Sequence, residues 1–453
     1  MNTKALRQKI LDFAIHGKLV PQDPNDEPAS VLLERIRAEK EHLIKEGKIK
    51  KPKKSKAACD KPHYPFELPK GWEWTTLGEV ISIKSGNAIK VRNNKNGLFP
   101  IYGGNGISGY SDEYNIDKPT IVIGRVGFYC GSIHYVKSKA WVTDNAFITS
   151  TYGNVYDIDF LYYLLTYCNL RQYSNSTAQP VISGKTIYPV HVPVPPIKEQ
   201  RKIVEKIEFW LSCISQLEFS QSKVKSTIKQ AKSKILDLAI HGKLVPQDPN
   251  DEPASELFKR INPKAEITCD NHQYGKLPKG WCLCHIPDVA NTLLGKTLDR
   301  SKNTGTPKDY LCAINVLWGK FDFTTHKQFL LEKNEYERYA VMKGDLMVCE
   351  GGDVGRCAIW EDDSKEIYYQ NALHRIRCKE GVFNYYILYL LWHYKLNGTI
   401  DYLCKGVTIK HFTQTVMNKL DILLPPFEEQ KRIVTKIEEL FAQLDKIESS
   451  LQV

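Results

Sequence analysis

The longest regular pattern of hydrophobic positions lies in the middle of the chain. From Glu199 up to Gly242 the sequence holds neither glycine nor proline, and apolar residues recur at steps of mainly three and four. They are Val204, Ile207, Leu211, Ile214, Leu217, Val224, Ile228, Ala231, Ile235 and Leu238. This spacing predicts one long α-helix packed in coiled-coil fashion on another helix. Such a helix would extend on the order of 65 Å.

Shorter versions of the same pattern stand at both ends of the sequence. Residues 3–17 carry Leu6, Ile10 and Phe13 before Gly17, which is a favourable helix stop. Residues 427–453 carry apolar side chains at Val434, Ile437, Phe441, Leu444, Ile447 and Leu451. Both segments are therefore predicted to be amphipathic helices.

Two blocks between these helices have a different texture. Residues 68–194 are rich in glycine, asparagine, tyrosine and β-branched residues, with short strand-like runs at 120–124 and 146–150 and a helical run at 157–170. Residues 277–424 repeat this texture, with strand-like runs at 345–349 and 374–378 and a helical run at 385–394. Each block is predicted to have an α+β fold.

The end of one helical stretch and the loop that follows it occur twice in the sequence, almost unchanged. Residues 9–30 (KILDFAIHGKLVPQDPNDEPAS) and residues 234–255 differ only at Phe13 against Leu238. Two further pairs frame the blocks. LPKGW occurs at 68–72 and 277–281, and PPIKEQRKIVEKIE at 195–208 matches PPFEEQKRIVTKIE at 425–438. Such repetition predicts two half-copies in tandem.

The repeats also predict how the helices pair. The middle helix joins a PPxxEQ segment to a KILD segment, and the two chain ends supply the same segments separately. We therefore expect a pseudo-twofold α+β protein, in which two α/β domains are separated by a pair of long antiparallel coiled-coil-like helices. The alternative is that unrelated amphipathic helices pack on their own blocks.

The composition narrows the class of protein. A hydrophobic content of 42% and a charged content of 25% are ordinary for a soluble globular chain. No apolar run is long enough for a membrane span, and residues 1–18 do not resemble a secretory signal. The expected location is the cytoplasm. A net charge of +11 permits nucleic acid as a partner without requiring it, because part of that charge comes from residues 45–56 (KEGKIKKPKKSK), which are typical of a solvated linker.

The cysteines indicate no structural framework. The twelve cysteines share no spacing between the halves and form no CxxC motif. A disulfide or zinc framework would repeat with the fold, so reduced thiols are expected and a metal site is the lesser alternative.

Each candidate catalytic motif lacks a residue or a neighbouring element that its chemistry requires. ISGKTI at 182–187 ends like a phosphate-binding loop, but Gln179 stands where glycine is needed and Pro180 interrupts the loop. LPPF at 424–427 lacks the polar residue that amino-methyltransferases place before Pro-Pro. The glycine-rich stretches 124–129 and 350–356 open no dinucleotide-binding helix. His16 and His241 recur within the repeat, which favours a capping or packing role.

With no catalytic motif supported, recognition of a binding partner is the remaining class of function. Loops in both blocks are rich in Asn, Lys, Arg and Tyr, and these side chains suit base edges and phosphates. The candidate DNA-contacting residues are Lys90, Arg92, Asn94, Asn105, Arg125 and Lys185 in the first block, and Lys296, Arg300, Lys302, Arg356, Lys405 and Lys410 in the second. Each one alone is also compatible with a phosphate contact or a plain surface charge.

The combined pattern resembles the specificity (S) subunit of type I restriction–modification systems. The resemblance rests on the duplicated KILD segment, the paired LPKGW and PPxxEQ motifs, and the stretches GRVG (124–127), GDVGR (352–356) and QNALHRIR (370–377). It implies a non-catalytic chain of five parts: residues 1–67 as a helix and linker, 68–194 as the first target-recognition domain, 195–276 as the central helix and linker, 277–424 as the second target-recognition domain, and 425–453 as the last helix.

The resemblance also implies partners. Each recognition domain would read one half of a split target in double-stranded DNA, and the helices would dock two methyltransferase (M) subunits, which restriction (R) subunits then join. The chain itself would bind no cofactor, while its partners would use S-adenosylmethionine, ATP and Mg. The alternatives are a helical protein-interaction scaffold without DNA specificity, a self-contained DNA methyltransferase or nuclease, and a dimeric repressor.

Overall fold

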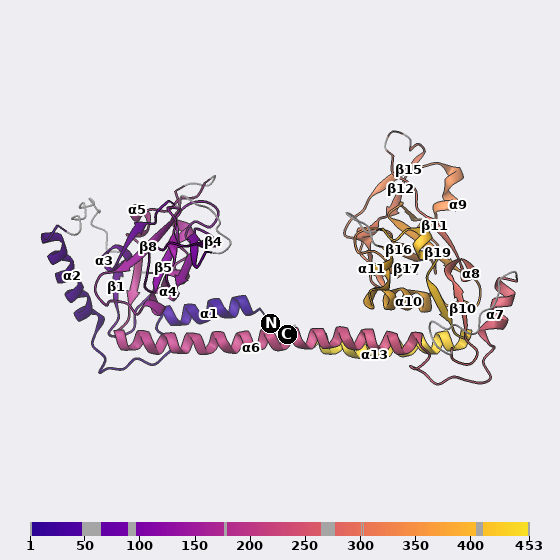
Figure 1. Ribbon diagram of the computed structural model, residues 1–453, viewed down its shortest axis with the longest axis horizontal. Helices are drawn as coiled ribbons and strands as arrows, with labels where there is room; N and C mark the ends of the chain where they lie inside the picture. Colours follow the sequence, from indigo (N-terminus) through magenta and orange to yellow (C-terminus); the bar gives the residue numbers. More distant parts are fainter. Residues whose placement is uncertain are drawn as a thin grey trace. The chain divides into compact units, whose positions relative to one another are not determined.

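The chain folds into two compact units, Met1–Ser220 and Gln221–Val453. The computed structural model describes residues 2–47, 65–88, 97–175, 179–263, 277–299, 301, 303–404 and 411–451 (Figure 1). The linker predicted at residues 45–56 lies mostly outside the described residues. Within the described part, no helix has both the length and the apolar character that crossing a bilayer requires.

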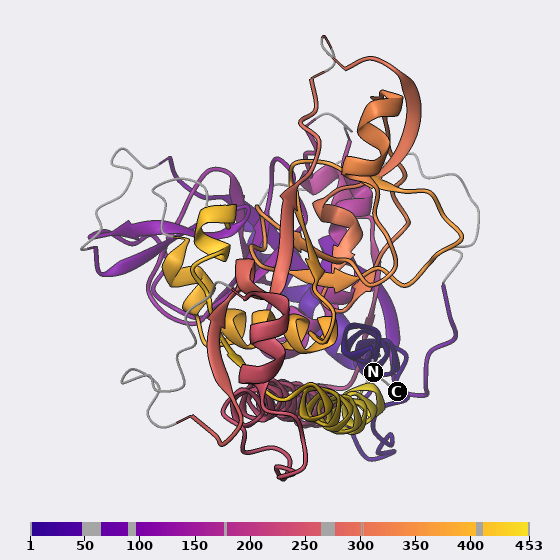
Figure 2. The same ribbon diagram turned by 90° about the vertical axis from the view of Figure 1, so that its right-hand side faces the viewer.

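One long helix, α6 (Ile197–Ile240), contributes to both units. In the second unit it pairs with α13 (Phe427–Ser450), as Figures 1 and 2 show. Lys232 forms an ion pair with Asp445, and the Gln221 side chain donates to the carbonyl oxygen of Leu451 at 3.1 Å. The residue numbers of the contacts run in opposite directions, which confirms the antiparallel pair predicted from the repeated segments.

In the first unit, the early part of α6 lies against α1 (Thr3–Ile15) (Figure 1). Arg7 of α1 donates to Glu218 at 2.9 Å and to Ser215 at 3.1 Å. The helix ends at Ile15, and Gly17 follows two residues later with a φ of 65°, which glycine adopts more readily than other residues. A Cβ atom at Gly17 would lie 2.3 Å from the Cγ atom of Pro69, so this glycine also lets the LPKGW motif pack closely.

The core of the first unit is an antiparallel sheet with the order β2-β8-β5-β6. Its strands are β2 (Ile81–Ser85), β8 (Ala146–Thr151), β5 (Thr120–Gly124) and β6 (Ile133–Val136). Every residue of the predicted strand 120–124 is buried, because β5 lies between two neighbours. A smaller sheet, β4-β3-β7, is made of β4 (Gly106–Ser111), β3 (Phe99–Gly103) and β7 (Trp141–Val142).

The second unit repeats this topology with different residues. Its main sheet has the order β11-β19-β16-β17, made of β11 (Ala290–Leu294), β19 (Leu373–Cys378), β16 (Leu346–Cys349) and β17 (Cys357–Ile359). The smaller sheet β15-β12-β18 is made of β15 (Gln328–Leu331), β12 (Thr306–Leu311) and β18 (Tyr368–Tyr369). In both units one strand of the smaller sheet pairs in parallel and the other antiparallel.

A buried helix covers each main sheet. In the first unit it is α4 (Ile158–Tyr167), followed by a 3-10 turn, η1 (Leu170–Tyr173), so the helix predicted over 157–170 is shorter and ends in a tighter turn. Its side chains Phe160, Leu164 and Leu165 are fully buried among residues of α1 and β5. In the second unit α10 (Asn384–Leu396) holds the same place and packs against α13.

A two-stranded ribbon connects each block to its helices, and the repeated motifs meet there. Strand β1 (Glu73–Thr76) pairs with β9 (His191–Val194), and β10 (Cys282–His285) pairs with β20 (Asp421–Leu424). The Trp72 indole N–H donates to Glu199 at 3.0 Å, and Trp281 donates to Glu429 at 3.1 Å. LPKGW and PPxxEQ therefore recur together because they form one buried joint in each half.

The remaining elements are short or peripheral. They are α2 (Ala29–Lys45), α3 (Leu77–Val80), α5 (Gly184–Ile187), α7 (Ala254–Ile261), α8 (Ile286–Val289), η2 (Ala313–Asn315), β13 (Val316–Leu317), β14 (Lys320–Phe321), η3 (Lys333–Glu335), α9 (Tyr336–Tyr339), α11 (Thr399–Leu403) and α12 (Gln414–Met417).

Candidate nucleic-acid interface

The described candidate residues gather at one end of the main sheet in each unit. In the first unit β2 and β5 both end beside the start of β8, and Arg125 follows β5 directly. In the second unit β11 and β16 end beside the start of β19, and Lys296 follows β11 after one glycine. The equivalent strand ends of the two sheets therefore carry the polar loops.

Arg125 places its guanidinium group across this strand end. The Nη1 atom lies 3.2 Å from the Ser85 hydroxyl and 3.4 Å from the carbonyl oxygen of Asp144. The group also lies 5.4 Å from the ring centroid of Phe147. Among the described residues it meets no carboxylate, so its positive charge is available to an anion or to the acceptor edge of guanine.

Asn105 lies on the turn between β3 and β4, close to the same strand end. It lines a hollow of about 530 Å³ together with Gly104, Thr143, Asp144 and Asn145. The Arg125 amide donates to the carbonyl oxygen of Asn145 at 2.9 Å, which brings this hollow next to Arg125. Thr143 lines the hollow, and its hydroxyl is buried without a hydrogen-bond partner among the described residues.

Lys185 is exposed on the short helix α5. This turn is anchored to the Arg125 loop, because the Ile182 amide donates to the Arg125 carbonyl oxygen at 3.1 Å. The structure thus connects Asn105, Arg125 and Lys185 through neighbouring loops at one end of the first unit.

Two second-unit candidates are engaged within the protein. Lys296 forms an ion pair with Glu335, and its ammonium group lies 6.0 Å from the ring centroid of Tyr339. Arg356 donates from Nη2 to the carbonyl oxygen of Ala313 at 2.7 Å, while its Nε atom is buried without a partner among the described residues. Both side chains hold loops together at the strand ends.

The other candidates lie outside the described residues. These are Lys90, Arg92, Asn94, Arg300, Lys302, Lys405 and Lys410.

Sequence reasoning missed an aromatic pair in the loop after β5. Phe128 and Tyr129 are 68% and 47% exposed, and their rings meet edge to face at a centroid distance of 5.1 Å. The Arg171 guanidinium group lies 4.7 Å from the Phe128 ring centroid. The sequence contains a signal for this pair, because two adjacent aromatic residues end the glycine-rich motif GRVGFY (124–129).

Arg125 and Glu350 occupy the same backbone position in the two units. The Glu350 amide donates to the carbonyl oxygen of Ala372 at 2.9 Å, as Arg125 does to Asn145, and the Phe412 amide donates to the Glu350 carbonyl oxygen at 2.7 Å, as Ile182 does to Arg125. At this position one unit presents a cation and hydrogen-bond donor, and the other a carboxyl group.

The surroundings of Glu350 differ from those of Arg125. His374 stands on β19 where β8 has Phe147, and its imidazole lies 3.9 Å from the Glu350 carboxyl group. Burial lowers the pKa of His374 to about 4, so this ring is neutral near pH 7 and does not balance a carboxylate. Burial also raises the pKa of Glu350, while the charge of His411, at 3.9 Å, acts to lower it.

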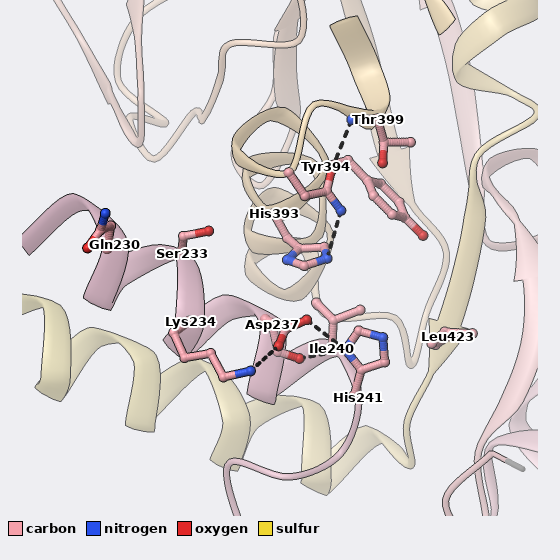
Figure 3. A pocket seen from close by; sticks show the side chains of 11 residues that line it. Gln230, Ser233, Lys234, Asp237, Ile240, His241, His393, Tyr394, Thr399 and Leu423 are labelled. Carbon is pink, nitrogen blue, oxygen red and sulfur yellow. Dashed lines mark hydrogen bonds and ion pairs between the residues drawn. The ribbon is translucent and has the colours of Figure 1, made fainter. Parts of the chain in front are cut away.

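A second hollow lies at the end of α6 in the second unit, and Figure 3 shows its lining. His393 faces His241 there, with ring centroids 6.1 Å apart. The Nε2 atom of His393 lies 3.1 Å from the side-chain Nδ2 atom of Asn397. The His241 Nδ1 atom lies 2.7 Å from the carbonyl oxygen of Asp237, and His16 repeats this contact with Asp12 at 2.7 Å. Both histidines therefore bond to the last turn of a helix and pack against aromatic rings, in agreement with the predicted capping or packing role.

The described residues contain no group of side chains arranged to hold a metal ion. The ten cysteines among them are free thiols, and most are buried. Burial raises the pKa of Cys168 and Cys378 to about 12, so these thiols are poor nucleophiles.

The fold and the strand-end loops define a recognition protein with two similar units on paired helices. A model of the type I restriction modification DNA specificity domain matches residues 69–230 and 278–452, and the chain belongs to this family. It is a specificity subunit, which is the non-catalytic member of such a system. The resemblance seen in the repeated motifs is confirmed.

Two curated relatives and one solved structure are similar to this chain over most of its length. The chain is 27% identical to the type I restriction enzyme EcoAI specificity subunit of Escherichia coli, over 98% of this chain and 90% of that protein. It is also 27% identical to the EcoEI specificity subunit of E. coli, over 99% of this chain and 91% of that protein. A structure solved in work on complex assembly and conformational transition of the type I R-M system has the same fold, with a TM-score of 0.55 and 16% identity, over 86% of this chain and 94% of that one.

Proposed function

We propose that this subunit reads a bipartite DNA target, with one half-site for each unit. The observation that carries the proposal is the pair Arg125 and Glu350. One backbone framework presents opposite hydrogen-bonding groups at the same place. Arginine donates to the O6 and N7 atoms of guanine, whereas glutamate accepts from the amino group of cytosine. Two such readers would recognise different sequences.

We further propose the division of labour that the family resemblance implies. The recognition domains would comprise residues 68–194 and 277–424, and the repeated segments 1–67, 195–276 and 425–453 would form the frame. Two methyltransferase subunits would dock on the frame, followed by restriction subunits, and these partners would use S-adenosylmethionine, ATP and Mg. Large apolar side chains that α6 leaves exposed, Phe209 and Phe219 among them, support a protein contact there.

The proposed DNA contacts keep the candidates named from the sequence. Asn105, Arg125 and Lys185 are supported by their common place at the end of the first sheet. Lys296 and Arg356 are assigned an additional role in shaping the loops of the second reader. The remaining seven candidates rest on their residue types alone.

Methylome sequencing tests the proposal directly. A host strain that carries the methyltransferase partners is sequenced with and without this chain by single-molecule reads that detect methylated bases. We expect a methylated motif in two parts, separated by unread bases, only in the presence of the chain. A contiguous motif, or the same methylation in both strains, would refute bipartite reading.

A protein scaffold without DNA specificity is the rival function. Filter or anisotropy binding of the purified methyltransferase complex to the target duplex and to a scrambled duplex, measured over a salt series, separates the two. Phosphate contacts make log K fall linearly with log salt, and base contacts make the target bind more tightly than the scrambled duplex. Equal binding of both duplexes would support the rival.

A further inference from the structure

The loop after β5, residues 125–131, carries the most exposed aromatic pair of the first recognition block. We call it the stacking loop. Phe128 points its ring away from the core at 68% exposure, and Tyr129 stands beside it. Water contact with two adjacent aromatic rings is unfavourable, so a surface of this kind indicates a binding site.

The stacking loop is held in place before any partner arrives. The Cys130 amide donates to Gly127 at 2.9 Å, the Gly131 amide to Gly124 at 2.8 Å, and the Ser132 amide to Tyr129 at 3.1 Å. Gly127 and Gly131 have φ values of 86° and 81°, which other residues rarely adopt. The exposed rings therefore sit on a fixed turn, and binding would order little additional backbone.

Positive charge flanks the two rings. Arg171 lies over the Phe128 ring at 4.7 Å and Arg125 begins the loop. Neither guanidinium group meets a carboxylate among the described residues. Two cations beside two flat apolar faces match the chemistry of a nucleic acid strand, in which phosphates alternate with bases that stack on aromatic rings. A protein surface that buried this loop would have to supply two carboxylates together with an apolar pocket.

The second unit lacks this device at the equivalent turn. There the loop 350–355 reads EGGDVG, with Val354 buried and Asp353 paired to Lys395 at 3.1 Å. The two loops close with the same backbone hydrogen bonds, Gly124 to Ser132 at 2.8 Å and Cys349 to Arg356 at 2.8 Å. The aromatic rings are therefore an addition on a shared frame, because the equivalent loop 350–355 contains no aromatic residue.

From this contrast we infer that the stacking loop packs Phe128 and Tyr129 against bases of duplex DNA and opens a base step in one half-site only. The inference rests on the proposed function, and it adds a distortion of the DNA to base reading. Aromatic and apolar wedges that separate neighbouring bases are an established way for proteins to bend DNA. The ligand is double-stranded DNA with a deformable step beneath the loop, such as a pyrimidine–purine step.

The test uses target duplexes with 2-aminopurine placed singly along each half-site and bound by the purified complex of this chain with its methyltransferase subunits. The half-site of the first unit is identified beforehand by exchanging residues 68–194. We expect 2-aminopurine fluorescence to rise at one or two neighbouring positions of that half-site and at no position of the other. Phe128→Ala should abolish the rise and weaken target binding by about 10-fold, the scale of one lost aromatic–base stack.

Tyr114→Ala is the matched control, because Tyr114 is also an exposed aromatic residue of the first block, at 43%, but it precedes β5 and so lies at the opposite end of that strand from the stacking loop. It should leave the fluorescence pattern unchanged. Unchanged fluorescence in both half-sites of wild-type complexes, or a normal signal and affinity with Phe128→Ala, would overturn the inference. If Phe128→Ala instead prevented assembly with the methyltransferase subunits, the loop would be a protein contact and the inference would also fall. The proposed function fails separately, if the wild-type complex does not distinguish target from scrambled DNA.

Discussion

Trp72 donates its indole N–H to the buried carboxyl group of Glu199 at 3.0 Å, across 127 residues of sequence. Trp281 and Glu429 reproduce the contact in the second unit at 3.1 Å. Burial raises the pKa of both carboxyl groups, and the indole hydrogen bond acts in the opposite direction. Each joint therefore depends on a tryptophan that both fills the core and satisfies an otherwise costly polar group.

Replacing Trp72 by Phe keeps most of the apolar volume and removes the donor. We expect the first unit to lose about 1–3 kcal/mol of stability, the range for removing a hydrogen bond from a buried polar or charged group. Gln22, which donates to the other carboxyl oxygen of Glu199 at 3.2 Å, would remain. Hydrogen exchange of the full chain, followed by mass spectrometry, should show faster exchange in peptides of residues 65–220. Trp210→Phe is the control, since that side chain is 42% exposed, and it should have little effect. Equal effects of the two variants would contradict this account.

Gly131 and Gly127 offer a matched pair within the stacking loop. An added Cβ atom at Gly131 would lie 2.4 Å from the Arg171 backbone nitrogen, whereas one at Gly127 would meet nothing within 4 Å. Both glycines have positive φ, so each change to Ala carries a backbone strain of about 1–2 kcal/mol. Gly131→Ala should in addition displace the loop and weaken target binding more than Gly127→Ala does. Anisotropy titrations of the two complexes compare them, and equal affinities would contradict a rigid loop.

The second unit should be the more acid-sensitive half. Burial lowers the pKa of His374 and of His393 to about 4, whereas an unfolded imidazole titrates near 6.5. As the pH falls from 6.5 towards 4, these histidines therefore become protonated in the unfolded state but stay neutral in the folded state, which lowers the free energy of unfolding. Each histidine removes up to about 3 kcal/mol of stability over that window, and about 2 kcal/mol by pH 5.

His393→Tyr tests this sign, because it copies the first unit. Tyr167 stands at the equivalent place there, with its ring 6.1 Å from His16 and its hydroxyl 3.1 Å from Asp12. Thermal unfolding of wild type and variant is measured at pH 7.5 and pH 5.0. The variant should lose less stability on acidification than wild type. A larger loss in the variant would show that the buried imidazole is not the acid-sensitive group.

The length of α6 should set the number of unread bases. The helix is continuous from Ile197 to Ile240, so four residues inserted near Ser222 would lengthen it by about 6 Å. We expect the methylated motif to keep both halves and gain unread bases between them, as seen by methylome sequencing. Four residues inserted at the end of α13, after Ser450, are the control and should leave the motif unchanged. An unchanged motif with the Ser222 insertion would show that α6 is not the spacer.

Exchanging one recognition block should change one half of the target. The joint between block and frame is made by the ribbon strands β1 and β9 and by the Trp72–Glu199 contact, which recur in both units. Residues 68–194 taken from a relative with another target should therefore fold on this frame. Methylome sequencing should show a new sequence in one half and the original in the other. A change in both halves would contradict modular reading.

The sequence predicted the frame far better than the reading surface. The three- and four-residue spacing of apolar residues was enough to predict α6 and α13. Such spacing places these residues on one face of a helix, and it recurs over many turns of a long helix. The strand 120–124 was equally clear, since every one of its side chains is buried. The equivalent positions of Arg125 and Glu350 could not be predicted from the sequence, because they are defined by backbone hydrogen bonds to residues far away along the chain.

The sequence also does not show how each candidate cation is bonded within the protein. Lys296 and Arg356 were named as candidate DNA contacts from their residue type, and the structure pairs them with Glu335 and with the Ala313 carbonyl oxygen. Residue type does not reveal which cation is already paired. The aromatic residues Phe128 and Tyr129 were overlooked, because at the level of sequence an exposed ring and a core ring look alike.

Under the proposed function, the different side chains at the two equivalent strand ends would give the chain a polarity. A protein with two identical readers would accept its target in either orientation. With Arg125 in one reader and Glu350 in the other, a duplex offered in reverse order would present each half-site to the reader that rejects it. The subunit would therefore distinguish upstream from downstream, and everything assembled on it would inherit that direction along the chromosome.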